Sequence, residues 1–207
     1  MAIVTDLSPQ VKDKRRVNVY LDGRFFCGMD AMTVFLNRLK VGMEISEEEI
    51  ERIATEAELN AAVEKGARFL AASAKTEKEV YDHLLQKGYP PKVSALAVEK
   101  LKGAGFLCDA DYAAEYVESA IKKSGIKMIR LKLKQKGVSE KEIERALSDV
   151  SEASGADAVL QKYLRGKPAS PETYQKAYRH LLSKGFSYEA AAEALARQKS
   201  AREDDEA

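Results

Sequence analysis

Glycine and proline are scarce in this sequence, with 12 glycines and 5 prolines among 207 residues. That scarcity argues against a loop-rich all-β chain and against a collagen-like repeat. No apolar run approaches the length of about 18 residues that a transmembrane helix needs. The N-terminus lacks the basic and apolar segments of a secretory signal. The sequence therefore predicts a cytoplasmic protein that does not use a membrane.

Cysteine is also rare. Cys27 and Cys108 lie far apart, and neither a Cys-x-x-Cys pair nor a histidine cluster accompanies them. A zinc site is therefore not expected. We expect two free, buried thiols in a reducing compartment.

The motifs of the common enzyme classes are missing as well. The sequence has no phosphate loop, and Gly103-Ala104-Gly105 follows a predicted helix where a dinucleotide site would need a strand. His83 and His180 occupy the same position of two internal repeats, which favours a structural role over that of a general base. We predict a protein that is not an enzyme and uses no metal or other cofactor.

Charge is balanced in total, at +1, but is unevenly distributed. Residues 44–58 contain seven acidic side chains and one basic one, whereas residues 122–136 contain seven basic side chains and no acidic one. The chain ends in the acidic segment 201–207. A local basic surface is therefore the feature that points to a charged partner.

Three similar strings recur along the chain, at residues 84–89, 133–138 and 181–186. Their glycines, Gly88, Gly137 and Gly185, lie 49 and then 48 residues apart. Each string has a leucine four residues before the glycine and an apolar residue directly after it. This pattern predicts a helix that ends in a Schellman motif, with the glycine in the left-handed conformation. The three glycines are therefore interpreted as structural caps.

Capping residues place further helix starts around these turns. Ser139 with Glu142 and Thr76 with Glu79 form capping boxes, and Asp109 or Asp111 is the expected cap of an upstream helix. Each repeat thus becomes a three-helix unit of about 48 residues, unlike the TPR and ankyrin periods. Stacked units of this kind predict an elongated, curved array.

The first part of the chain differs from the repeats. Val17, Val19 and Leu21 alternate with other residues before Asp22-Gly23, which predicts a β-hairpin with a type I′ turn. The fold class is therefore mainly α, with three tandem three-helix repeats and a small N-terminal α+β cap. The predicted segments are the hairpin and an acidic helix at 1–58, repeats at 59–104, 105–152 and 153–200, and the acidic tail at 201–207.

The basic run falls on the predicted middle helix of the second repeat. Ile126, Ile129 and Leu133 have the spacing of a core-facing stripe. Basic residues follow the same spacing one position later, and others flank them. The candidate residues for binding a partner or DNA are Lys123, Lys127, Arg130, Lys132, Lys134 and Lys136. The run is open to three interpretations: a solvated face, a site for a polyanion, or a site for an acidic protein groove.

The same residues carry a family resemblance. Residues 125–138, GIKMIRLKLKQKGV, resemble the central signature of the RecX family of RecA regulators, and residues 106–113 are similar to the segment before it. The resemblance implies tandem three-helix repeats and a non-enzymatic monomer that binds the RecA recombinase, chiefly its filament on single-stranded DNA. It also implies restraint of the ATPase and strand-exchange activity of RecA in recombination and DNA repair. The alternative is a helical-repeat protein that binds single- or double-stranded DNA directly through the basic stripe.

Overall fold

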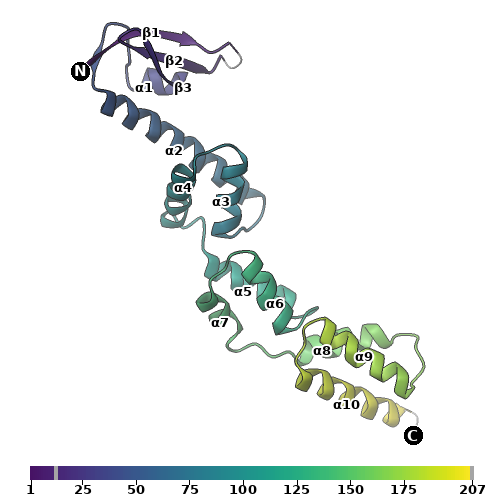
Figure 1. Cartoon of the computed structure of the whole chain (residues 1–207). Helices are drawn as coiled ribbons and strands as arrows, with labels where there is room; N and C mark the ends of the chain where they lie inside the picture. Colours follow the sequence, from purple (N-terminus) through teal and green to yellow (C-terminus); the bar gives the residue numbers. More distant parts are fainter. Residues whose placement is uncertain (12–13, 206–207) are drawn as a thin grey trace. The chain divides into compact units, whose positions relative to one another are not determined.

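The computed structural model describes residues 1–11 and 14–205. Within these residues the chain forms four strands and ten helices (Figure 1). It divides into two compact units, the first made of Met1–Ser73 and Val80–Leu107, the second of Ala74–Glu79 and the residues from Cys108 onward. Across the described ranges, none of the helices combines the length and the apolar character that a membrane span requires.

The N-terminal segment is a small antiparallel sheet with strand order β3-β2-β1-β4. Asp22 and Gly23, which join the second and third strands, have φ of +48° and +79°. Positive φ at both positions is what a type I′ turn requires, so the predicted hairpin is confirmed. The strands are β1 (Ala2–Pro9), β2 (Arg16–Leu21), β3 (Arg24–Asp30) and β4 (Glu44–Ile45).

Two helices follow these strands, α1 (Ala31–Leu36) and α2 (Glu47–Ala72). Ser46 caps α2 by accepting a hydrogen bond of 3.1 Å from the backbone N–H of Glu49. The helix then continues for 26 residues without interruption. The segment boundary predicted at residues 58 and 59 therefore lies inside one helix, because this stretch contains no proline and only one glycine, Gly66, to end it.

The repeats are built from the remaining helices together with the second half of α2. Each has its own buried core, centred on Val80 and Leu84, on Ile129 and Leu133, or on Leu160 and Leu181. The predicted three-helix units are thus confirmed, whereas their elongated, curved arrangement stays a prediction. The helices are α3 (Glu77–Gln86), α4 (Pro91–Gly103), α5 (Asp109–Ala120), α6 (Ile126–Gln135), α7 (Glu140–Leu147), α8 (Ala153–Leu164), α9 (Pro171–Ser183) and α10 (Tyr188–Asp205).

The middle helix of each repeat ends in the same turn. Gly88, Gly137 and Gly185 have φ of +89°, +88° and +88°. After α6, the N–H of Val138 donates to the carbonyl of Leu133 at 3.1 Å, and the N–H of Gly137 donates to the carbonyl of Lys134 at 3.0 Å. These are the two hydrogen bonds of a Schellman motif, and the turns after α3 and α9 have their counterparts.

Within the second unit, the start of α3 docks on the turn after α6. The hydroxyl of Thr76 donates to the carbonyl of Lys136 at 2.7 Å. A Cβ built on Gly137 would lie 2.5 Å from the Cβ of Lys78, so only glycine permits this approach. The buried carboxylate of Asp109 accepts a hydrogen bond of 2.8 Å from the N–H of Glu77, the first residue of α3. The position before α5, which Asp109 or Asp111 was expected to cap, is instead held by Cys108, whose side chain makes no capping bond.

The same joint recurs between the start of α6 and the turn after α9. The N–H of Gly125 donates to the carbonyl of Lys184 at 3.0 Å. A Cβ built on Gly185 would lie 2.5 Å from the backbone nitrogen of Met128. The buried carboxylate of Glu152 accepts hydrogen bonds from the N–H groups of Ile126 and Ser187, at 2.6 and 2.9 Å. Two places within the second unit therefore combine a glycine turn with a buried acid in the same way.

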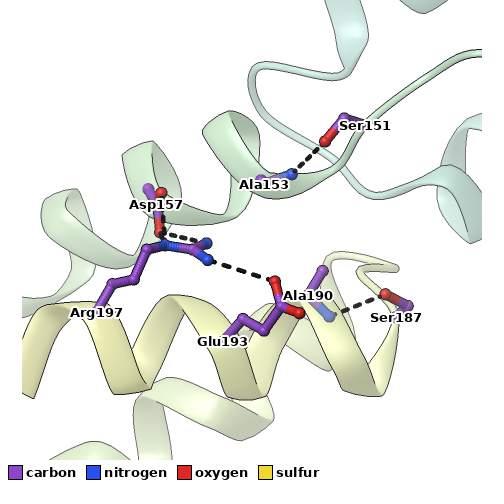
Figure 2. A network of polar contacts seen from close by, with 7 residues as sticks. All are labelled: Ser151, Ala153, Asp157, Ser187, Ala190, Glu193 and Arg197. Carbon is purple, nitrogen blue, oxygen red and sulfur yellow. Dashed lines mark hydrogen bonds and ion pairs between the residues drawn. The ribbon is translucent and has the colours of Figure 1, made fainter.

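Polar contacts on the surface also hold the third repeat together (Figure 2). The guanidinium of Arg197 on α10 lies 3.0 Å from Asp157 on α8 and 3.3 Å from Glu193. Ser187 caps α10 through a hydrogen bond of 3.1 Å from the N–H of Ala190. α10 continues into the acidic tail predicted at 201–207, of which residues 206–207 lie outside the described part.

Candidate partner-binding surface

The basic stripe lies on α6, where Ile129 and Leu133 are fully buried in the core of the second repeat. Lys127, Lys132 and Lys134 are exposed, whereas Arg130 is partly buried. The helix therefore presents its cations beside its apolar face, as an amphipathic pattern requires.

Acidic side chains of α7 neutralise part of this stripe. The Nη1 atom of Arg130 lies 2.6 Å from Glu140 and also contacts Glu144, and the Nζ atom of Lys134 lies 2.6 Å from Glu140. The hydrogen bonds that Arg130 donates to Glu144 and Glu140 raise the pKa of its guanidinium. The hydrogen bond from Lys134, followed by that from Arg130, lowers the pKa of the Glu140 carboxyl. Two of the six candidate cations are thus engaged within the repeat.

A third candidate, Lys136, belongs to the joint between α3 and α6. Its Nζ atom lies 2.6 Å from Glu79 and 5.3 Å from the centroid of the Tyr112 ring. Burial alone would lower the pKa of Lys136, but the hydrogen bonds to Glu79 and Tyr112 raise it. This lysine is therefore a structural contact between the start of α3 and the end of α6 within the second unit.

The other three candidates, Lys123, Lys127 and Lys132, are exposed. Considering the described residues alone, none of the three forms an ion pair within 4 Å. The structure therefore divides the predicted set of six into three cations that are held by acidic neighbours and three that face solvent.

The chain matches four family descriptions in order. Residues 2–46 match the regulatory protein RecX N-terminal domain, and residues 62–101, 109–147 and 152–195 match the first, second and third RecX three-helix domains. Regulatory protein RecX of Clostridium botulinum (strain Eklund 17B / Type B) is 34% identical over 196 residues, which cover 91% of this chain and 92% of the relative. The chain belongs to the RecX family. The regulatory protein RecX of Clostridium tetani is 31% identical over 90% of this chain and 89% of its own length.

Solved structures of the RecX family support the same fold. One, described as the crystal structure of regulatory protein RecX, has a TM-score of 0.65 and 29% identity, and covers 92% of this chain and 97% of its own. RecX from Lactobacillus salivarius has a TM-score of 0.61 and 23% identity over 68% of this chain and 96% of its own, and supports the fold alone. This RecX-family chain is therefore assigned a regulatory role.

The two histidines of this RecX-family chain have ring partners. His83 stacks on Phe69 with ring centroids 4.0 Å apart, and His180 stacks on Tyr163 at 4.6 Å. Burial, together with nearby lysines, lowers the pKa of both imidazoles. These stacks are consistent with the structural role that repeat symmetry favoured.

The cysteines differ from expectation in one respect. Cys27 is partly buried, and burial raises the pKa of its thiol, but Cys108 is exposed. The prediction of two buried thiols is therefore wrong for Cys108, because this residue lies in the N-cap position of α5 and not on a core face. The described residues contain no group of three or more His, Cys, Asp or Glu side chains placed to hold a metal ion.

Proposed function

We propose that this chain binds the RecA recombinase, chiefly its filament on single-stranded DNA, and restrains its ATPase and strand-exchange activity in recombination and DNA repair. Membership of a family of regulatory proteins supports this proposal, and the RecX resemblance of residues 125–138 supplies the identity of the partner. The observation that carries it is the exposure of Lys127 and Lys132 on the central repeat without an acidic neighbour in the described chain.

The contact we propose is between these lysines and an acidic surface of RecA. Complementary charge across an interface accelerates association and fixes the register of the two partners. Lys127 and Lys132 both lie on α6, which the buried Ile129 and Leu133 anchor in the core. A partner would therefore meet charges that are carried on a rigid helix.

A retention assay tests the choice of partner. The full chain is immobilised and offered RecA with a slowly hydrolysed ATP analogue, with and without single-stranded DNA, and separately DNA alone. We expect strongest retention of the RecA filament and measurable retention of DNA-free RecA. Retention of DNA alone, with no added retention of RecA, would favour the direct DNA-binding alternative.

A charge reversal tests the surface. The double variant Lys127→Glu/Lys132→Glu leaves the ion pairs of α7 intact, and Lys92→Glu/Lys100→Glu on α4 is the control with the same charge change on exposed residues. The readout is inhibition of the DNA-dependent ATPase of RecA at low and at moderate salt. We expect the α6 variant to need at least tenfold more protein for half-inhibition, with the larger effect at low salt, where screening is weakest. Equal inhibition by both variants, with unchanged circular dichroism, would move the contact away from α6.

A further inference from the structure

A second basic surface lies in the second unit, and none of its cations belongs to α6 itself. It is a hollow of about 720 Å³ between the turn after α5, the end of α8 with its following turn, and the end of α9. The cations that line it are Lys122, Lys123, Lys162, Arg165, Lys167 and Lys184. They come from three separate segments of the chain, so the sequence shows only the first two as part of a basic run.

Within the described residues, the cations of this hollow have no acidic side chain beside them in its lining. In the part of the chain that the structure describes, no ion pair joins any of the six cations to an acid. This contrasts with α6, where Glu140 engages both Arg130 and Lys134. The cations of a concave site repel one another, and the binding of an anion there reduces that repulsion.

The hollow also has an aromatic wall. Tyr163 and His180 line it, and their stacked rings lie 4.6 Å apart. The Nζ atom of Lys167 lies 3.2 Å from the centroid of the Tyr163 ring. His180 and Lys167 thus cover the two faces of the Tyr163 ring, so a nucleic acid in this hollow would be held by contacts between its phosphates and the cations, and not by bases stacked on Tyr163.

The joint between repeats holds one side of the hollow in place. Lys184 lies in the turn after α9, and its carbonyl accepts the hydrogen bond from Gly125. The end of α9 is thereby fixed against the start of α6, only a few residues after Lys122 and Lys123. The site is thus partly organised before any ligand binds, which reduces the ordering cost of binding.

From this combination we propose that the hollow binds the phosphate backbone of a single-stranded nucleic acid, without base specificity. A concave site of this volume has the size of a ligand pocket. It suits a flexible strand better than a rigid duplex, whose backbone runs along the outside of a wide helix. Lysines that contact phosphates bind the nucleic-acid backbone and do not distinguish one base from another. The proposal is independent of the RecA contact on α6, because it concerns binding that occurs when RecA is absent.

Fluorescence anisotropy with a labelled oligo(dT) strand and no RecA tests the hollow. The site variant is Lys122→Gln/Lys162→Gln/Lys184→Gln, and the matched control is Lys92→Gln/Lys100→Gln/Lys176→Gln, which removes three exposed lysines elsewhere. We expect the site variant to bind at least tenfold more weakly than the parent and the control to bind like the parent. Each phosphate contact on a single strand contributes about 0.7 to the steepness of the plot of log affinity against log salt concentration. Removing three lysines should therefore make the slope for the site variant less steep by about 2.

Competition experiments distinguish a single-stranded nucleic acid from two other classes of ligand, a duplex and an acidic protein segment. An unlabelled duplex and poly-glutamate are used as competitors at equal charge. Stronger competition by poly-glutamate would assign the hollow to an acidic protein segment, and stronger competition by the duplex would overturn the choice of a single strand. Equal affinity of site variant and control, with both folded by circular dichroism, would overturn the site itself. Inhibition of RecA by Lys127→Glu/Lys132→Glu is measured separately, so the two proposals can fail independently.

Discussion

The ammonium group of Lys136 lies 2.6 Å from the carboxylate of Glu79, 57 residues earlier in the chain. Both side chains are about one-third exposed, at 31% and 30%. The Thr76 hydroxyl donates to the carbonyl of the same lysine. Lys136 therefore links the start of α3 to the end of α6 through both its backbone and its side chain.

Removing this lysine should weaken the second unit more than removing a neighbour on the same helix. Lys136→Met leaves Glu79 partly buried without its charged partner, so we expect a loss of about 1–2 kcal/mol in the free energy of unfolding. Lys134→Met breaks a pair whose side chains are 51% and 50% exposed, and should cost no more than about 0.5 kcal/mol. Urea unfolding of both variants measures the difference. Equal losses would mean that the joint does not depend on this pair.

The Glu79 carboxyl should make the joint sensitive to acid. Burial alone would raise the pKa of Glu79, but hydrogen bonds from Lys136 and Thr76 lower it below its ordinary value. A carboxyl whose pKa is lowered by folding stabilises the protein above the ordinary pKa of about 4.3, and that stabilisation is lost as pH falls through the lowered pKa. The stability advantage of the parent over Glu79→Gln should thus be full at about pH 7 and smaller at about pH 3. Urea unfolding at the two pH values checks this, and an advantage that persists undiminished in acid contradicts it.

Local signals were sufficient to predict much of this fold. The turns at Gly88, Gly137 and Gly185 and the hairpin at Asp22-Gly23 each depend on a few consecutive residues, because a positive φ or a cap is a property of the local backbone. The spacing of about 48 residues between these turns then predicted the three-helix units. The boundary predicted between residues 58 and 59 separated an acidic helix from the first repeat, but residues 47–72 form one continuous helix.

Contacts between repeats could not be predicted in the same way. Asp109 and Glu152 are buried acids that accept hydrogen bonds from the N–H groups of Glu77 and Ser187, 32 and 35 residues away, and their sequence neighbours do not distinguish them from surface acids. The partners of Arg130 lie 10 and 14 residues later, on the next helix. Glu140 and Glu144 are four residues apart on α7 and therefore lie on one face of that helix. That spacing could have indicated an acidic face able to pair with the cations of α6. The hollow lined by Lys162 and Lys184 had no linear signal, because its cations come from separate segments.

The glycines of the three turns should differ in how well they tolerate alanine. A Cβ built on Gly88 would meet no atom within 4 Å, so Gly88→Ala adds only the strain of a left-handed backbone, about 1–2 kcal/mol. Gly185→Ala adds a clash with the backbone nitrogen of Met128, 2.5 Å away, and should cost clearly more. Gly137→Ala meets the side chain of Lys78 at 2.5 Å and should also exceed Gly88→Ala.

Thermal melts followed by circular dichroism rank the three variants. Gly88→Ala serves as the matched control, because its φ of +89° is nearly the same as the +88° of the other two glycines. A Gly185→Ala melt as mild as that of Gly88→Ala would show that the repeats do not approach as closely as the joint between α6 and α9 requires.

Charge reversal within α6 should separate cations that support the fold from those that are free to bind. Arg130→Glu places a third carboxylate beside Glu140 and Glu144, and like charges at this distance repel. We expect Arg130→Glu to lower the free energy of unfolding by about 1 kcal/mol, since these side chains remain largely in contact with solvent. Lys127→Glu, on the same helix without an acidic neighbour in the described chain, should change it by no more than about 0.5 kcal/mol.

A charge swap makes this prediction specific to the pair. In Arg130→Glu/Glu144→Arg the two charges exchange helices, Glu140 keeps its contact with Lys134, and the attraction between positions 130 and 144 is restored, whereas the new carboxylate at position 130 still faces Glu140. The free energy of unfolding, measured in urea, should then recover part of what Arg130→Glu loses, and raising the salt concentration should shrink both the loss and the recovery because screening weakens both. A swap that recovers nothing would mean that Arg130 supports the repeat through the packing of its aliphatic stem and not through its charge.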